Sequence, residues 1–304
     1  MTGVSRRGFL TGLTGLVGGF LVPGCGKTSS GWSDPPNNKP SSSKISPSTN
    51  QESYQLGARF ADGYLAPSVL AAGFSQRAPF ILLGTDGWPA IDGVPNSLQI
   101  SVIHDRTIIH EDRLERHGEP GVTPYYPLVF TPQEPGDYQL LAEGVSSPYK
   151  FRVINRKETG LIQIGDLMRP VDTPTINDPR GVEPICTYHD GVCPLHDFTL
   201  TEALDAEGPT ALLISTPRFC QTDVCGPALE VLLSLYQGIP GLTAIHAEVW
   251  TNEKLQSLTP ADTTYNLDFE PSLVVANSRG AVCDVLHFAM DTREVRKALR
   301  RSVN

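Results

Sequence analysis

The chain has 304 residues, 39% of them hydrophobic and 19% charged, which is enough for about two domains with ordinary cores. Its net charge of −9 and its pI near 5.3, without any basic patch, exclude nucleic acid as an expected partner.

The first 25 residues predict an export signal. "SRRGFL" (residues 5–10) is a twin-arginine pattern, and a glycine-diluted apolar run follows it. This run is too short and too weakly apolar to predict a membrane-spanning helix. It ends in "LVPGC", which resembles a bacterial lipobox with Cys25 as the lipidated residue, although Pro23 departs from that pattern. A plain secretion signal with an incidental cysteine is the alternative, and both place the mature protein outside the cytoplasm.

Residues 26–54 are rich in Ser, Pro, Asn and Lys and contain almost nothing apolar. Such a segment cannot offset its ordering entropy by burial, so we expect a disordered tether.

Residues 55–155 predict an all-β domain. Short β-type runs separated by Asp-Gly and Pro-Gly turns lie at 79–84, 98–104, 107–110, 127–131, 137–142 and 149–154. This pattern is typical of an antiparallel sandwich of immunoglobulin-like type. His104, His110 and His117 match no copper-ligand spacing, so we expect ordinary strand or surface histidines there.

Residues 156–198 predict an irregular connector with a local cysteine motif. "CTYHDGVCPLH" contains Cys186, His189, Cys193 and His196 within eleven residues. These ligands are more crowded than in a usual zinc site, whose two pairs are separated by a longer loop. A Cys186–Cys193 disulfide suits an oxidising compartment better, and free thiols or a metal are the alternatives.

Residues 199–304 predict an α/β domain. A Thr-capped helix begins at 199, and buried strands are predicted at 210–216 and 242–250. Between these strands, Leu229, Leu232, Leu233 and Tyr236 mark one face of a helix. A hairpin at 272–277 and 281–288 and an Asp-capped helix at 291–301 complete the pattern.

Two motifs in this region resemble the thioredoxin-like superfamily, near its extracytoplasmic peroxiredoxin-like and Sco-like branches. "TPRFCQTDVCGPALEVL" occupies the position of the active-site loop and helix, and "FEPSLVV" places Pro271 where the family has its cis-proline. The resemblance covers about a third of the chain. It implies thiol–disulfide exchange without a cofactor, with Pro271 presenting backbone to a substrate chain.

The Cys220–Cys225 pair is the predicted reactive centre. Cys225 precedes Gly226 and Pro227 at the predicted helix start, where the helix amides and dipole stabilise a thiolate. We therefore expect Cys225 to be the nucleophile and Cys220 to be the resolving thiol. Ala228 stands where thioredoxin has its second cysteine, so the order of the pair is reversed.

Three alternatives to exchange stay open. Pro217, Thr222 and Cys225 resemble a peroxiredoxin motif in which the Thr222 hydroxyl would bind peroxide. A Sco-like copper chaperone would use Cys220 and Cys225 with a distant histidine, and an inert disulfide would serve a binding module. Cys283, the odd cysteine, is expected to fill a core.

The sequence therefore predicts a multidomain protein, in which an immunoglobulin-like sandwich precedes a thioredoxin-like domain. It predicts an extracytoplasmic oxidoreductase that acts on protein thiols and disulfides and is held at the lipid bilayer through Cys25.

Overall fold

The computed structural model describes residues 54–303 except 65, 221 and 222. The export signal, Cys25, the tether and Thr222 therefore lie outside the described residues. All described residues belong to a compact unit that spans residues 50–304. Within this part of the chain, no helix combines the length and the apolar character that crossing a membrane requires.

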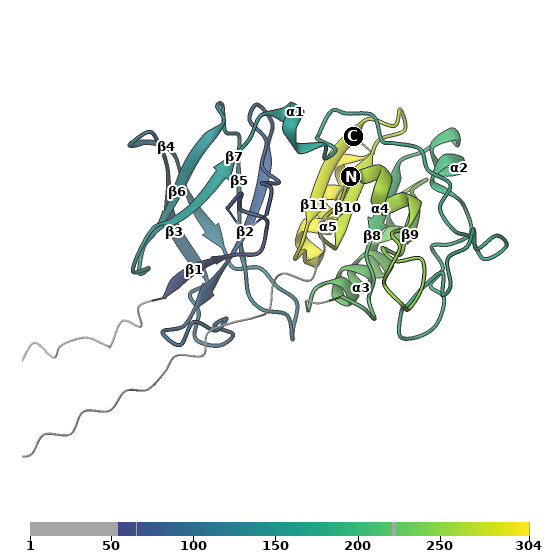
Figure 1. The fold of residues 1–304 in the computed structure, drawn as a ribbon, viewed down its shortest axis with the longest axis horizontal. Coiled ribbons are helices and arrows are strands. Elements are labelled where there is room, and N and C mark those ends of the chain that lie inside the picture. The colour runs from purple at the N-terminus through teal and green to yellow at the C-terminus, as the bar shows by residue number, and fades with distance from the viewer. Residues whose placement is uncertain (1–53, 65, 221–222, 304) are drawn as a thin grey trace, which may run out of the picture. The chain divides into compact units, whose positions relative to one another are not determined.

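Two antiparallel sheets are formed by residues 55–153, with strand orders β1-β2-β5 and β4-β3-β6-β7 (Figure 1). The strands are β1 Gln55–Ala58, β2 Gln76–Leu83, β3 Ser97–His104, β4 Thr107–Glu115, β5 Tyr126–Phe130, β6 Gly136–Ala142 and β7 Tyr149–Val153. Each strand predicted in this region is present, and β1 is an addition. β4 runs on to Glu115, well beyond the predicted 107–110, because it pairs with β3 back to Ser97.

Aromatic side chains join these two sheets in one core. Phe80 on β2 and Phe130 on β5 meet Phe151 on β7, with ring centroids 6.2 and 6.0 Å apart. Both contacts are edge-to-face, a geometry that stabilises by about 0.5–1.5 kcal/mol per pair beyond the burial itself. The period-two pattern of the sequence places these rings on the inner faces.

A third sheet has the strand order β11-β10-β8-β9. Its strands are β8 Thr210–Ile214, β9 Thr243–Ala247, β10 Ser272–Ala276 and β11 Val282–His287. β8 and β9 are parallel, and β10 is antiparallel to both β8 and β11. The predicted buried strands and the hairpin are confirmed.

Five α-helices accompany the sheets in the described residues: α1 Arg156–Thr159, α2 Leu200–Asp205, α3 Cys225–Leu235, α4 Pro260–Tyr265 and α5 Thr292–Arg301, with a 3₁₀ turn, η1, at Tyr236–Gly238. Thr199 caps α2 through a capping box with Glu202. Asp291 caps α5 by accepting a hydrogen bond from the amide of Glu294. Both predicted caps are confirmed, because capping depends only on neighbouring residues.

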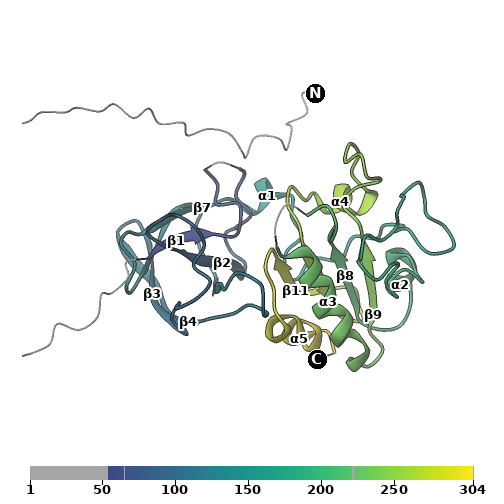
Figure 2. The same ribbon diagram turned by 90° about the horizontal axis from the view of Figure 1, so that it is seen from below.

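The third sheet is buried on both faces. Leu213 and Val275 pack with residues of α3 and α5, which lie together along one face (Figure 2). Leu212 and Val274, one residue along each strand, join a core that continues to the aromatic residues of the first two sheets. This continuity explains why the described residues form one compact unit, and the domain limits at 155 and 199 stay a prediction.

Candidate redox site

Cys220 and Cys225 form a disulfide with their Cα atoms 6.1 Å apart. Cys225 is the first residue of α3, as the Cys-Gly-Pro sequence predicts. The two cysteines differ in exposure. Cys225 has no exposed surface, whereas Cys220 is half-buried. A reagent in solution therefore reaches the pair through Cys220.

The start of α3 suits a negatively charged sulfur. Val224 occupies the N-cap and has an apolar side chain that cannot accept the first-turn amides. Pro227 has no amide hydrogen, and the amide of Ala228 donates to the carbonyl of Val224 at 3.0 Å. A helix start leaves its first amides without partners inside the helix, so those of Cys225 and Gly226, together with the dipole, stabilise an anion there.

The loop before the disulfide is a tight turn that follows β8. The amide of Cys220 donates to the carbonyl of Thr216 at 3.0 Å, and the Thr216 hydroxyl accepts from the amide of Val249 at 2.9 Å. The turn therefore carries Cys220 back toward the start of α3, and a pair separated by four residues can close.

Glu270 is a residue of this site that the sequence did not suggest. Its carboxylate lies within 4.8 Å of both cysteine sulfurs. The amide of Thr216 donates to Glu270 Oε2 at 2.8 Å, which holds the carboxylate against the turn. Glu270 precedes Pro271 through a cis peptide bond just before β10, so Pro271 lies next to a residue of the site. A lone Glu in a loop gave no pattern that could have identified it.

Residues of the all-β region support the disulfide loop. Asp223 pairs with Arg59 at 2.8 Å and accepts from the amide and the hydroxyl of Thr123 at 3.2 and 2.9 Å. Burial opposes the charge on Asp223, but the bonds from Arg59 and Thr123 outweigh it and lower the pKa of this carboxyl. Val224 packs in a small core with Ile81, Tyr125 and Ala289. The loop between the two cysteines is therefore anchored to the all-β region.

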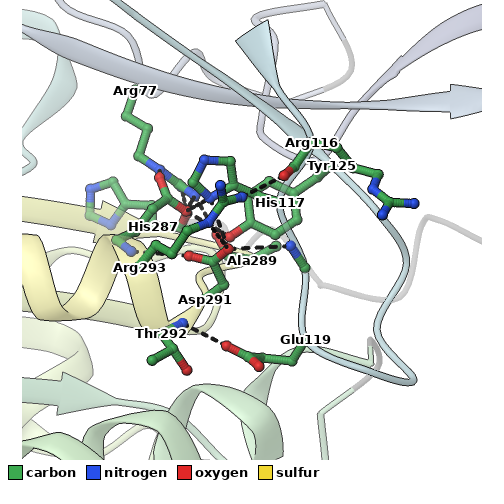
Figure 3. Close-up of polar contacts among 12 residues, drawn as sticks. Arg77, Arg116, His117, Glu119, Tyr125, His287, Ala289, Asp291, Thr292 and Arg293 are labelled. Atoms are coloured by element: carbon green, nitrogen blue, oxygen red, sulfur yellow. Dashed lines mark hydrogen bonds and ion pairs between the residues drawn. The ribbon is translucent and has the colours of Figure 1, made fainter. Parts of the chain in front are cut away.

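A second polar network ties β2 and the segment after β4 to the start of α5 (Figure 3). Arg77 pairs with Glu294 at 2.7 Å and donates to the carbonyls of His287 and Ala289 at 2.8 and 2.6 Å. The hydroxyl of Tyr125 donates to the same Glu294 carboxylate at 2.6 Å. The side chains of Arg77 and Glu294 are only 8% and 11% exposed, so this is a buried ion pair.

His117, expected to be an ordinary strand or surface histidine, also belongs to this network. Its Nδ1 lies 2.9 Å from Asp291 Oδ2 (Figure 3). Burial opposes the charge on Asp291, but the contact with His117 and the hydrogen bonds from the amides of Glu294 and Gly118 hold its pKa well below the usual range. One carboxylate thus caps α5 and also fixes the segment after β4.

The other predicted cysteines are not part of the disulfide site. Cys283 lies on β11, where its thiol donates to the carbonyl of Val275 at 3.2 Å and burial raises its pKa to about 11. Cys186 and Cys193 are buried free thiols, so the local disulfide that the sequence favours is not formed in the structure. Their ligand atoms lie together with those of His196 and His246, and this group could hold a metal.

Comparisons with known proteins place the chain in no family. No protein-family model matches it, and no curated protein does. Among solved structures, one of MTB DsbF in its mixed oxidised and reduced forms matches with 16% identity and a TM-score of 0.26. The match covers 41% of this chain and 98% of that chain. A likeness at this TM-score supports no argument about fold or activity.

Proposed function

We propose that this chain is a thiol–disulfide oxidoreductase that acts on protein thiols and disulfides through Cys220 and Cys225. One observation carries the proposal: the disulfide closes at the first residue of α3, with the carboxylate of Glu270 within 4.8 Å of both sulfurs. A sulfur at a helix start and a nearby proton acceptor are the two parts that exchange chemistry needs.

The architecture supports a finer assignment. The order of β8, α3, β9, β10, β11 and α5, with cis-Pro271 before β10, fits a thioredoxin-like domain from residue 199. The two antiparallel sheets fit an immunoglobulin-like sandwich over residues 55–155. Export by the twin-arginine route and lipid anchoring through Cys25 belong to the same proposal and rest on the sequence motifs alone.

The exposure of the two sulfurs supports a direction of attack. A substrate thiolate attacks Cys220 Sγ, because Cys225 has no exposed surface. The Cys220–Cys225 bond breaks, a mixed disulfide forms on Cys220, and Cys225 leaves as a thiolate at the start of α3. A second substrate thiolate then attacks the substrate sulfur of the mixed disulfide. The substrate is released oxidised and the protein reduced, and the reverse steps reduce a substrate disulfide.

This order differs from the sequence-based expectation, in which Cys225 meets the substrate. The helix start still has a role, because a thiol with a low pKa is the better leaving group. Glu270 would accept the proton of an approaching substrate thiol, so that the thiolate attacks Cys220. Cys220 is thus proposed as the substrate-facing sulfur and Cys225 as the stabilised leaving group.

The copper-chaperone alternative has less support at this pair. Among the described residues, the possible metal ligands grouped at the disulfide are its two sulfurs and Glu270. His246 lies with Cys186 and Cys193 and is not in this group. An inert structural disulfide is the alternative that experiment must separate from exchange.

Equilibration of the full chain with a series of redox buffers, followed by thiol trapping, tests the proposal. A reactive pair titrates in the range of known catalytic couples, whereas a pair that stays oxidised below about −300 mV is structural. In a Cys283→Ser background, Cys225→Ser should accumulate mixed disulfides on Cys220, and Cys220→Ser should accumulate few. The opposite result would restore Cys225 as the substrate-facing sulfur. Trapping by neither variant, together with a pair that resists reduction, would refute exchange.

A further inference from the structure

Four metal-ligating side chains meet in the interior, away from the disulfide. Cys186, Cys193 and His196 come from the connector between α1 and α2, and His246 comes from β9. Their exposed fractions are 6%, 2%, 0% and 0% in that order. The amide of His246 donates to the carbonyl of Leu195 at 3.1 Å, so backbone pairing holds the connector beside β9.

The distances within this cluster match a tetrahedral site. His246 Nδ1 lies 3.3 Å from His196 Nε2, 3.7 Å from Cys186 Sγ and 3.6 Å from Cys193 Sγ. A tetrahedral zinc ion with Zn–N of about 2.0 Å and Zn–S of about 2.3 Å separates two nitrogens by roughly 3.3 Å and a nitrogen from a sulfur by roughly 3.5 Å. All four ligand atoms lie within 4.8 Å of one another, so one ion can contact them all.

The contacts around the cluster orient its ligands. His246 Nε2 lies 3.1 Å from the carbonyl oxygen of Ser215. A carbonyl oxygen can only accept, so Nε2 carries the hydrogen and Nδ1 turns its lone pair toward the sulfurs. Metal-bound histidines ordinarily have such a partner on the other ring nitrogen. The amide of Cys193 lies 3.4 Å from Cys186 Sγ and donates to it, which favours a thiolate there.

We infer that Cys186, Cys193, His196 and His246 bind one Zn²⁺ ion in a closed, tetrahedral structural site. Two thiolates balance the charge of the ion, which suits a buried position. Four protein ligands leave no open position for water or substrate, which distinguishes a structural zinc site from a catalytic one. His189, the histidine of the first Cys-x₂-His pair in the sequence, is not a ligand because its side chain is 64% exposed.

The site would also brace the disulfide loop. Thr187 follows Cys186, and its amide and hydroxyl donate to the carboxylate of Glu248 at 2.6 and 3.2 Å. The Thr187 hydroxyl also accepts from the amide of Arg218, at 3.2 Å, in the turn that carries Cys220. Zinc would thus fix the connector on which this turn rests, whether or not the disulfide is catalytic.

Elemental analysis and native mass spectrometry of the full chain, purified without chelator, test the inference on the unaltered protein. We expect one zinc ion per chain, with Cys186 and Cys193 protected from alkylation until the metal is removed. A chain that lacks zinc and contains a Cys186–Cys193 disulfide would overturn the assignment. So would a chain that carries copper in place of zinc.

Variants then locate the ion. Cys186→Ser and His246→Gln should each lose most of the zinc, whereas the matched controls Cys283→Ser and His189→Ala should keep it. Replacement of the zinc by Co²⁺ should give the absorption bands of tetrahedral thiolate-bound cobalt, which report on ligand type without relying on a variant that folds poorly. Zinc retained in both Cys186→Ser and His246→Gln would place the ion elsewhere and refute the site.

Discussion

The buried pair of Arg77 and Glu294 offers a sharp test of how the all-β region is held against α5. Arg77 comes from β2, and its guanidinium makes two bonds to the Glu294 carboxylate and two to backbone carbonyls. Arg77→Met keeps an unbranched apolar stem but removes all four of these hydrogen bonds. Glu294 then retains its charge in a site where only 11% of its side chain is exposed.

Breaking a buried ion pair by removing one partner costs about 3–5 kcal/mol, because the remaining charge loses its compensation. For a unit of this size, each kcal/mol lowers Tm by about 2–4 °C. Arg77→Met should therefore lower Tm by roughly 6–20 °C. The free energy of unfolding from urea titration, followed by circular dichroism, should fall by the corresponding amount.

Two further variants make this test specific. Arg77→Met combined with Glu294→Gln removes both charges and should recover at least half of the loss, because no uncompensated charge remains. Arg152→Met breaks an ion pair whose partners are 46% and 63% exposed, and it should leave Tm unchanged within error. A loss below about 1 kcal/mol in Arg77→Met would refute the argument, because the pair would then behave like one at the surface.

Three other predictions concern the carboxylates. Glu270→Gln should lower the pKa of the reduced thiols, because it removes a nearby negative charge. Stopped-flow exchange should slow on the order of 10²-fold, because the proposed proton acceptor is lost. An unchanged pH–rate profile would remove Glu270 from the proposed chemistry. The depressed pKa of Asp291 stabilises the folded state fully above its unfolded pKa of about 3.9, and this stability is lost as pH falls toward the folded pKa. The free energy of unfolding should therefore fall more steeply with decreasing pH for the wild type than for Asp291→Asn. Asp223→Asn weakens the bond to Arg59 and should speed reduction of the disulfide by a small thiol by about twofold to fivefold, whereas Glu253→Gln, at an exposed ion pair, should not.

Local patterns in the sequence were sufficient to identify several elements. The continuous apolar run at 210–216 predicted the buried strand β8, and the spacing of Leu229 and Leu232 predicted α3. Thr199 and Asp291 predicted the starts of α2 and α5. These features depend on residues within one or two turns of each other, so no tertiary information was needed.

The extent of other elements depended on pairing. β4 contains few buried residues and carries a run of charged side chains, so its sequence shows no alternation beyond residue 110. Its length is decided by β3, which offers hydrogen-bond partners from Ser97 to His104. An exposed strand of this kind cannot be recognised from periodicity, because it has no buried face.

In the candidate sites, too, the sequence identified the local features and only the tertiary structure decided the distant contacts. The sequence alone identified Cys220 and Cys225 as a pair and placed Cys225 at a helix start, because both features are local. It favoured a Cys186–Cys193 disulfide, whereas the structure leaves both thiols free and brings His246 to Cys186 from 60 residues away. Glu270 reaches the disulfide from 45 residues beyond Cys225, through the pairing of β10 with β8. Only tertiary structure could decide these contacts, because the register of distant strands, and not the spacing of neighbours, determines which side chains meet in the interior.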